Sequence, residues 1–104
     1  MSDAPAGEDP EVRRQRALAL LEANHAFPCE FSVSVIARND DVVTAAVLVA
    51  AGFPEAPPEG AHERRPSGGD RYVSHRLKIP CGTAEHVLEL FARLRAVDGV
   101  ITVL

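Results

Sequence analysis

The alternation of apolar and polar side chains over residues 71–79 places the strongest constraint on the fold. A period of two residues is typical of a β-strand that buries one face and exposes the other. We therefore predict a strand over Arg71–Ile79, preceded by a turn at Pro66–Gly69. Its core face would carry Val73, His75, Leu77 and Ile79, and its open face Tyr72, Ser74, Arg76 and Lys78.

Composition limits the chain to one domain of an ordinary globular class. With 104 residues, 46% hydrophobic and 25% charged, the chain is long enough for a single core. The net charge of −4 argues against a general nucleic-acid binder. No apolar run approaches the ~20 residues that span a bilayer, and the polar N-terminus lacks a signal-peptide pattern. We expect a cytoplasmic protein with reduced thiols and no membrane association.

The remaining pattern predicts helices and strands in a regular order. Asp9 before Pro10 caps a first helix, the cluster Asn39–Asp41 caps a second, and Thr83 caps a third. The proline-rich residues 53–60 are expected to form a loop. The predicted elements are a disordered tail (1–9), a helix with its linker (10–26), a strand (29–37), a helix (42–51), an edge strand (61–66), the strand 71–79 ended by Pro80, a helix from residue 84 terminated by Asp98-Gly99, and a strand (100–104).

This order of elements predicts the fold. Strand, helix, strand, strand, helix, strand is the split βαβ arrangement. We predict an α+β, ferredoxin-like domain over residues 27–104, with a four-stranded antiparallel sheet, two helices on one face and an additional N-terminal helix. Right-handed crossovers give the strand order 4-1-3-2. Matching the core faces pairs Phe31 with Ile79, Val33 with Leu77, Val35 with His75 and Ala37 with Val73.

The sequence also resembles a family, the YbeD-like small bacterial proteins of uncharacterised function, over residues 25–104. The resemblance rests on Phe27-Pro28, on Arg65-Pro66-Ser67 followed by Tyr72 and Ser74, on Glu85 with Val87, and on the ending Val103-Leu104. It implies a ferredoxin-like fold akin to ACT domains, the small-molecule-sensing modules of metabolic enzymes. The resemblance carries no catalytic residues to this chain. The chain departs from the family in its long N-terminal segment, its proline loop and Gly68-Gly69-Asp70.

From the fold and the resemblance we expect a non-enzymatic regulatory or interaction module without a cofactor. It would bind a small metabolite or a protein partner, and a homodimer would suit a ligand held between two modules. The absence of a Ser-His-Asp grouping with a supporting motif agrees with this expectation. His75 on the core face is expected to form a local hydrogen bond rather than to bind a metal.

Two neighbouring regions are candidates for ligand binding. The open face combines hydroxyls, including Ser32 and Ser34, with cations that could receive an acidic partner, although a solvated polar face is the simpler interpretation. The glycine turn lies beside Arg64, Arg65 and Arg71, whose cations are expected to converge on it, and it could bind an anion through backbone N–H groups, although a plain hairpin turn is simpler. RNA binding is not expected, because Tyr72 alone would offer a stacking platform. The candidate residues are Arg65, Ser67, Gly68, Gly69, Arg71, Tyr72, Ser74, Arg76 and Lys78.

The alternative is a thiol- or metal-dependent protein. The predicted register places Cys29 opposite Cys81, and His86 lies in the first turn of the following helix. Three such side chains would suit zinc or a redox pair, but no CxxC spacing supports the site. Two buried, inert cysteines are the preferred interpretation.

Overall fold

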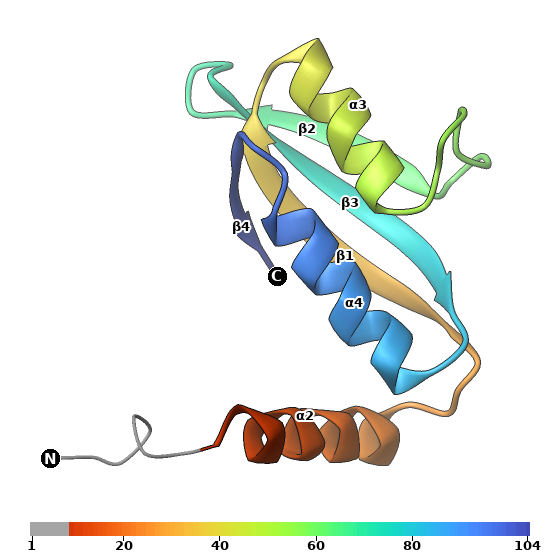
Figure 1. Cartoon of the computed structure of the whole chain (residues 1–104). Helices are drawn as coiled ribbons and strands as arrows, with labels where there is room; N and C mark the ends of the chain where they lie inside the picture. The colour runs from red at the N-terminus through yellow and green to blue at the C-terminus, as the bar shows by residue number, and fades with distance from the viewer. Residues whose placement is uncertain (1–8) are drawn as a thin grey trace, which may run out of the picture.

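A computed structural model describes residues 9–104, which form a four-stranded sheet with helices packed against it (Figure 1). The predicted tail lies outside the described residues except for Asp9, whose side chain accepts a hydrogen bond from the Glu11 N–H (2.8 Å). The elements in chain order are α2 (Pro10–Asn24), β1 (Cys29–Arg38), α3 (Asp41–Ala50), β2 (His62–Ser67), β3 (Tyr72–Cys81), α4 (Ala84–Arg95) and β4 (Val100–Val103).

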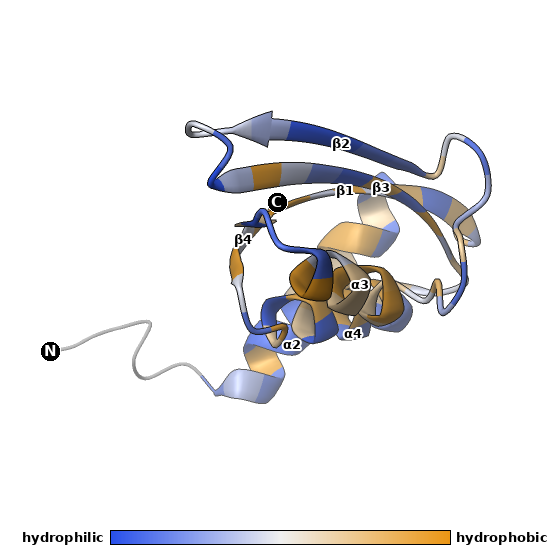
Figure 2. Ribbon diagram, turned by 90° about the horizontal axis from the view of Figure 1, so that it is seen from above, coloured by the Kyte–Doolittle hydropathy of each residue, from blue (hydrophilic) through white to orange (hydrophobic). Residues whose placement is uncertain are grey.

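The sheet has the strand order β2-β3-β1-β4, and all neighbouring strands are antiparallel. This confirms the predicted α+β class and the predicted order, read from the opposite edge. Helices α3 and α4 cover one face of the sheet, while no helix of residues 9–104 covers the other face (Figure 1, Figure 2). The sheet therefore has a core face and an open face.

The register of β1 against β3 is the predicted one from Cys29–Cys81 to Arg38–Tyr72. Burial determines it, because a slip by one residue would turn every core side chain of a strand to solvent. The core face is completed by α3 and α4. Side chains with at most 2% exposure include Val33, Val35, Val47, Val73, His75, Leu77, Val87, Leu90 and Leu94.

The turn between β2 and β3 lies two residues later than the sequence predicts. It comprises residues 68–71 instead of Pro66–Gly69, and Ser67 belongs to β2. The Lys78 N–H donates to the Ala61 carbonyl oxygen (2.9 Å). Because bonded pairs recur at every second residue of an antiparallel ladder, the backbone groups of the odd-numbered residues of β2 bond to β3. The Pro66 nitrogen then faces the free edge of the sheet, where proline removes no bond of the ladder.

Pro80 does not end β3, contrary to the prediction. The strand continues to Cys81, and Pro80 lies opposite Glu30 of β1. Like Lys78 two residues earlier, Pro80 turns its nitrogen away from β1 and toward the side of β2. Because β2 begins opposite Leu77, no strand residue lies beside Pro80 to accept a bond. The missing N–H is therefore tolerated.

The helices begin at the predicted caps. Asp40 accepts bonds from the first N–H groups of α3, and the Thr83 hydroxyl accepts from the His86 N–H (3.1 Å) at the start of α4. Helix α4 ends at Arg95, before the predicted Asp98-Gly99. Helix α2 docks through Leu18, which is 7% exposed. None of the helices in residues 9–104 combines the length and the apolar character that a membrane span requires.

Candidate functional site

The open face of the sheet gathers polar side chains from three strands. Their outward direction follows from the period of two, since helices α3 and α4 occupy the other side (Figure 2). All of them are exposed or partly exposed. We use "open face" for Ser32 and Ser34 of β1, Glu63, Arg65 and Ser67 of β2, and Tyr72, Ser74, Arg76 and Lys78 of β3.

The strand register alternates cations with hydroxyls on the open face. Directly opposite residues in antiparallel strands have Cβ atoms about 4.5–5.5 Å apart, within reach of long side chains. Each cation therefore has a hydroxyl neighbour that could share a hydrogen-bond acceptor with it. The opposing pairs are Arg76 with Ser34, Lys78 with Ser32, and Arg65 with Ser74, while Glu63 lies opposite Arg76 on its other side.

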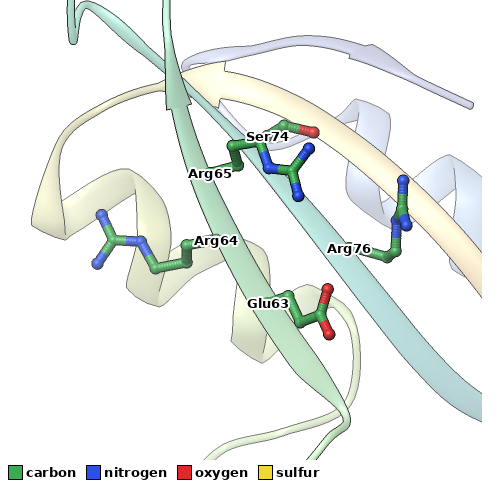
Figure 3. Close-up of a pocket in the computed structure, with 5 residues that line it drawn as sticks. All are labelled: Glu63, Arg64, Arg65, Ser74 and Arg76. Carbon is green, nitrogen blue, oxygen red and sulfur yellow. The ribbon is translucent and has the colours of Figure 1, made fainter.

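A shallow hollow lies between β2 and β3. Its volume is about 90 Å³, and it is lined by Glu63, Arg64, Arg65, Ser74 and Arg76. Figure 3 shows Glu63, Arg65 and Arg76 extending on one side of the strands, whereas Arg64 points to the other side of β2. Pockets for small molecules usually measure about 300–1,000 Å³. The hollow can admit a single carboxylate or phosphate group, but it cannot enclose a whole metabolite.

Comparison with known proteins identifies a family. The family described as "Protein of unknown function (DUF493)" matches residues 22–104. The chain belongs to the DUF493 family. A search of curated proteins and a search of solved structures each gave no match. Most of α2 precedes the matched residues, so the DUF493 region holds the sheet, α3 and α4.

In the DUF493 region, the predicted turn residues lie at one end of the open face. Gly68, Gly69 and Asp70 have φ angles of 60°, 68° and 67°, in the left-handed region that glycine adopts most easily. The Asn39 side chain donates to the Asp70 carbonyl oxygen (2.9 Å), and the Asn39 N–H donates to the carbonyl oxygen of Arg71 (2.9 Å). The end of β1 therefore holds the turn in place.

The three arginines near this turn do not converge, contrary to the sequence prediction. Arg65 lies on the open face, and Arg71 lies in the turn. Arg64 lies on the opposite side of β2 and donates to the Asn39 Oδ1 atom (3.3 Å). Sequence reasoning also missed Glu63 of the open face, because β2 has no apolar pattern that would mark its two faces.

On the core side, His75 forms the predicted local hydrogen bond. Its Nδ1 atom lies 2.9 Å from Nε2 of His62, and the two rings stack with centroids 5.1 Å apart. Burial, helped by His62 and Arg64, lowers the pKa of His75 to about 4. Burial and Arg64 also lower the pKa of His62. The other ring nitrogen of His75 is buried and has no hydrogen-bond partner.

The two cysteines of the DUF493 region face each other, as predicted. Cys81 is buried, but Cys29 is only partly buried, so the interpretation of two buried thiols is wrong for Cys29. His86 does not complete a metal site. Its Nδ1 atom accepts the Gly82 N–H (3.4 Å), and residues 9–104 contain no group of three His, Cys, Asp or Glu residues that could hold a metal ion.

Proposed function

We propose that this chain is a cytoplasmic, non-enzymatic interaction module whose open face binds an acidic segment of a partner protein. The observation that carries the proposal is an uncovered sheet face on which cations and hydroxyls alternate in register. Hydroxyl and guanidinium donors together match the acceptors of a carboxylate. No catalytic residue is needed for this role.

The size of the hollow supports a protein partner over an isolated small metabolite. A volume of about 90 Å³ fits one carboxylate from a longer segment. Arg65 and Arg76 both line the hollow, and guanidinium groups pair with carboxylates through two parallel hydrogen bonds. A small metabolite would be enclosed only if a second copy of the domain covered the hollow. A regulatory module that binds a metabolite in this way would therefore be a homodimer.

The charge of the open face supports the same partner. Arg65, Arg76 and Lys78 outnumber the two acidic residues Glu63 and Glu30 on this side of the sheet, although the chain as a whole carries a net charge of −4. A local excess of positive charge attracts acidic partners and raises their association rate. The rest of the surface would repel them, which favours binding at this face.

The fold assignment belongs to the same proposal. The element order β1-α3-β2-β3-α4-β4, with both helices on one face, is the order of ferredoxin-like domains. We propose that this DUF493 domain is ferredoxin-like and ACT-like and is related to the YbeD-like proteins. The exposed sheet of such an architecture leaves a whole face for a partner.

A titration with a glutamate-rich peptide tests the proposed function. NMR signals of isotope-labelled protein should shift at β2 and β3, and the double variant R65E/R76E should bind at least about tenfold more weakly. The matched control is R13E/R14E on exposed positions of α2, which changes the net charge equally. Equal weakening in both variants, or shifts confined to α3 and α4, would overturn the proposal.

A further inference from the structure

Cys29 and Cys81 occupy a hydrogen-bonded pair at the end of the sheet. The Asn39 N–H bonds to the Arg71 carbonyl oxygen, and in an antiparallel ladder hydrogen-bonded pairs recur at every second residue. Counting along the β1–β3 register from Asn39–Arg71 in steps of two reaches Cys29–Cys81. Both side chains therefore point to the same face, and each cysteine is the terminal residue of its strand.

This position brings the two thiols within reach of a covalent bond. A hydrogen-bonded pair holds its Cα atoms about 5.5 Å apart, inside the range of about 4.4–6.8 Å that disulfides span. A disulfide also draws the Cβ atoms to about 3.8 Å. The strand ends can make this approach, because Gly82 follows Cys81 and no further β1–β3 pair lies beyond Cys29.

The two thiols differ in access to solvent. Cys29 is partly exposed and Cys81 is 1% exposed. A surface hollow of about 400 Å³ leads to them, lined by Pro28, Cys29, Pro80, Cys81 and Gly82. Cys29 is therefore the cysteine that a small disulfide reaches more easily, because Cys81 is almost completely buried.

We propose that Cys29 and Cys81 form a dithiol modification site, which low-molecular-weight disulfides oxidise to an intramolecular bond between β1 and β3. The site lies apart from the open face and is independent of the proposed function. The bond would join β1 and β3 covalently at the end of the sheet from which the chain continues into α4.

The chemistry consists of two thiol–disulfide exchanges. The Cys29 thiolate attacks the small disulfide, forming a mixed disulfide and releasing one small thiolate. The Cys81 thiolate then attacks the Cys29 sulfur, which forms the cross-strand bond and releases the second small thiolate. The protein loses two electrons and two protons, and the small disulfide is reduced to two thiols.

The electrostatics of the pair agree with this order. Burial and the neighbouring Cys29 raise the pKa of Cys81, and Arg93 opposes part of this rise. A buried thiol with a raised pKa is a poor nucleophile toward solutes, because the thiolate is the reactive form. Once Cys29 carries the mixed disulfide, the attack by Cys81 is intramolecular and needs no access to solvent.

The experiment exposes dilute protein to oxidised glutathione and follows the intact mass. The wild-type chain should lose two hydrogens without forming dimers, and dithiothreitol should restore them. In the C81S variant a single glutathione should remain on Cys29. In C29S, modification of Cys81 should be at least about tenfold slower than that of Cys29 in C81S.

The wild-type measurement keeps the test valid even if a variant is poorly folded. The same reaction in denaturant serves as the control, because unfolding removes the difference in access and slows closure of the ring. Two stable glutathione adducts on the folded wild-type chain, an intermolecular dimer, or no oxidation would each overturn the inference.

Discussion

His75 has both ring nitrogens in the protein interior. Nδ1 bonds to His62, whereas Nε2 is buried and no protein group accepts a hydrogen bond from it, so a proton added at Nε2 would have no acceptor in the protein. The positive charge of Arg64 opposes protonation further. The cationic form of His75 is therefore far less favourable in the folded state than in the unfolded chain.

This difference predicts how stability depends on pH. The pKa of His75 falls from 6.5 in the unfolded chain to about 4 in the folded one. Between these values the unfolded chain binds more protons, so stability is complete above pH 6.5 and is lost as the pH falls toward 4. The loss should reach about 3 kcal/mol. Urea unfolding across this range measures it.

The H75L variant checks the assignment. Leucine keeps the buried volume apolar and removes the titrating ring, so the fall in stability over the same pH range should largely disappear. His62 remains and contributes a smaller dependence in the same direction, since its pKa is also lowered. An unchanged pH dependence in H75L would assign the effect to other groups.

The two glycines of the β2–β3 turn offer a matched pair of substitutions. Both have positive φ angles, but a Cβ at Gly68 would lie 2.9 Å from the Tyr72 ring, whereas a Cβ at Gly69 would meet nothing within 4 Å. G69A should cost about 1–2 kcal/mol from the left-handed backbone alone. G68A should cost more, because the ring must also move. Equal midpoints in urea would contradict the role of Tyr72.

At the scale of elements, α2 depends on docking for its helicity. An isolated helix of 15 residues is only marginally stable in water. Within α2, Leu18 is 7% exposed, whereas Leu20 is 59% exposed. The side of α2 that carries Leu18 therefore packs against the rest of the domain, whereas the side that carries Leu20 faces solvent.

The variants L18A and L20A test this dependence. Burying a leucine contributes about 1.5–3 kcal/mol. Hydrogen exchange of the α2 amides should accelerate at least about tenfold in L18A, because undocking lets the helix unfold. L20A should exchange as the wild type does. Similar exchange in both variants would show that Leu18 does not hold the helix.

At the scale of the whole molecule, the cross-strand disulfide would close a long loop of the unfolded chain. Oxidation links residue 29 to residue 81, and the chain-entropy model gives about 4 kcal/mol for a loop of this length. The oxidised protein should therefore unfold at a higher urea concentration than the reduced protein. C29S treated with the same oxidant is the control and should show no shift. A lower midpoint after oxidation would indicate that the bond strains the folded state.

Much of the fold could be predicted from local patterns. The period of two in β1 and β3 identifies the core side chains, and burial of Val33 and Leu77 allows one register, which is the observed one. The candidate site was predicted less completely. Alternation predicts Ser74 and Arg76 on the open face. The residues of β2 are all polar or proline and almost all exposed, so no apolar pattern shows that Glu63 and Arg65 share this face while Arg64 lies on the other.

By itself, the sequence determined the order of the elements, the side of the sheet on which each β1 and β3 side chain lies, and the facing of Cys29 and Cys81. These features depend on periodicity and on the area that folding buries. Only the tertiary structure decided that β3 continues through Pro80, that His62 bonds to His75, and that Cys29 keeps access to solvent. Each of these depends on where a neighbouring strand begins or ends, because that position decides which backbone groups need partners and which side chains remain uncovered.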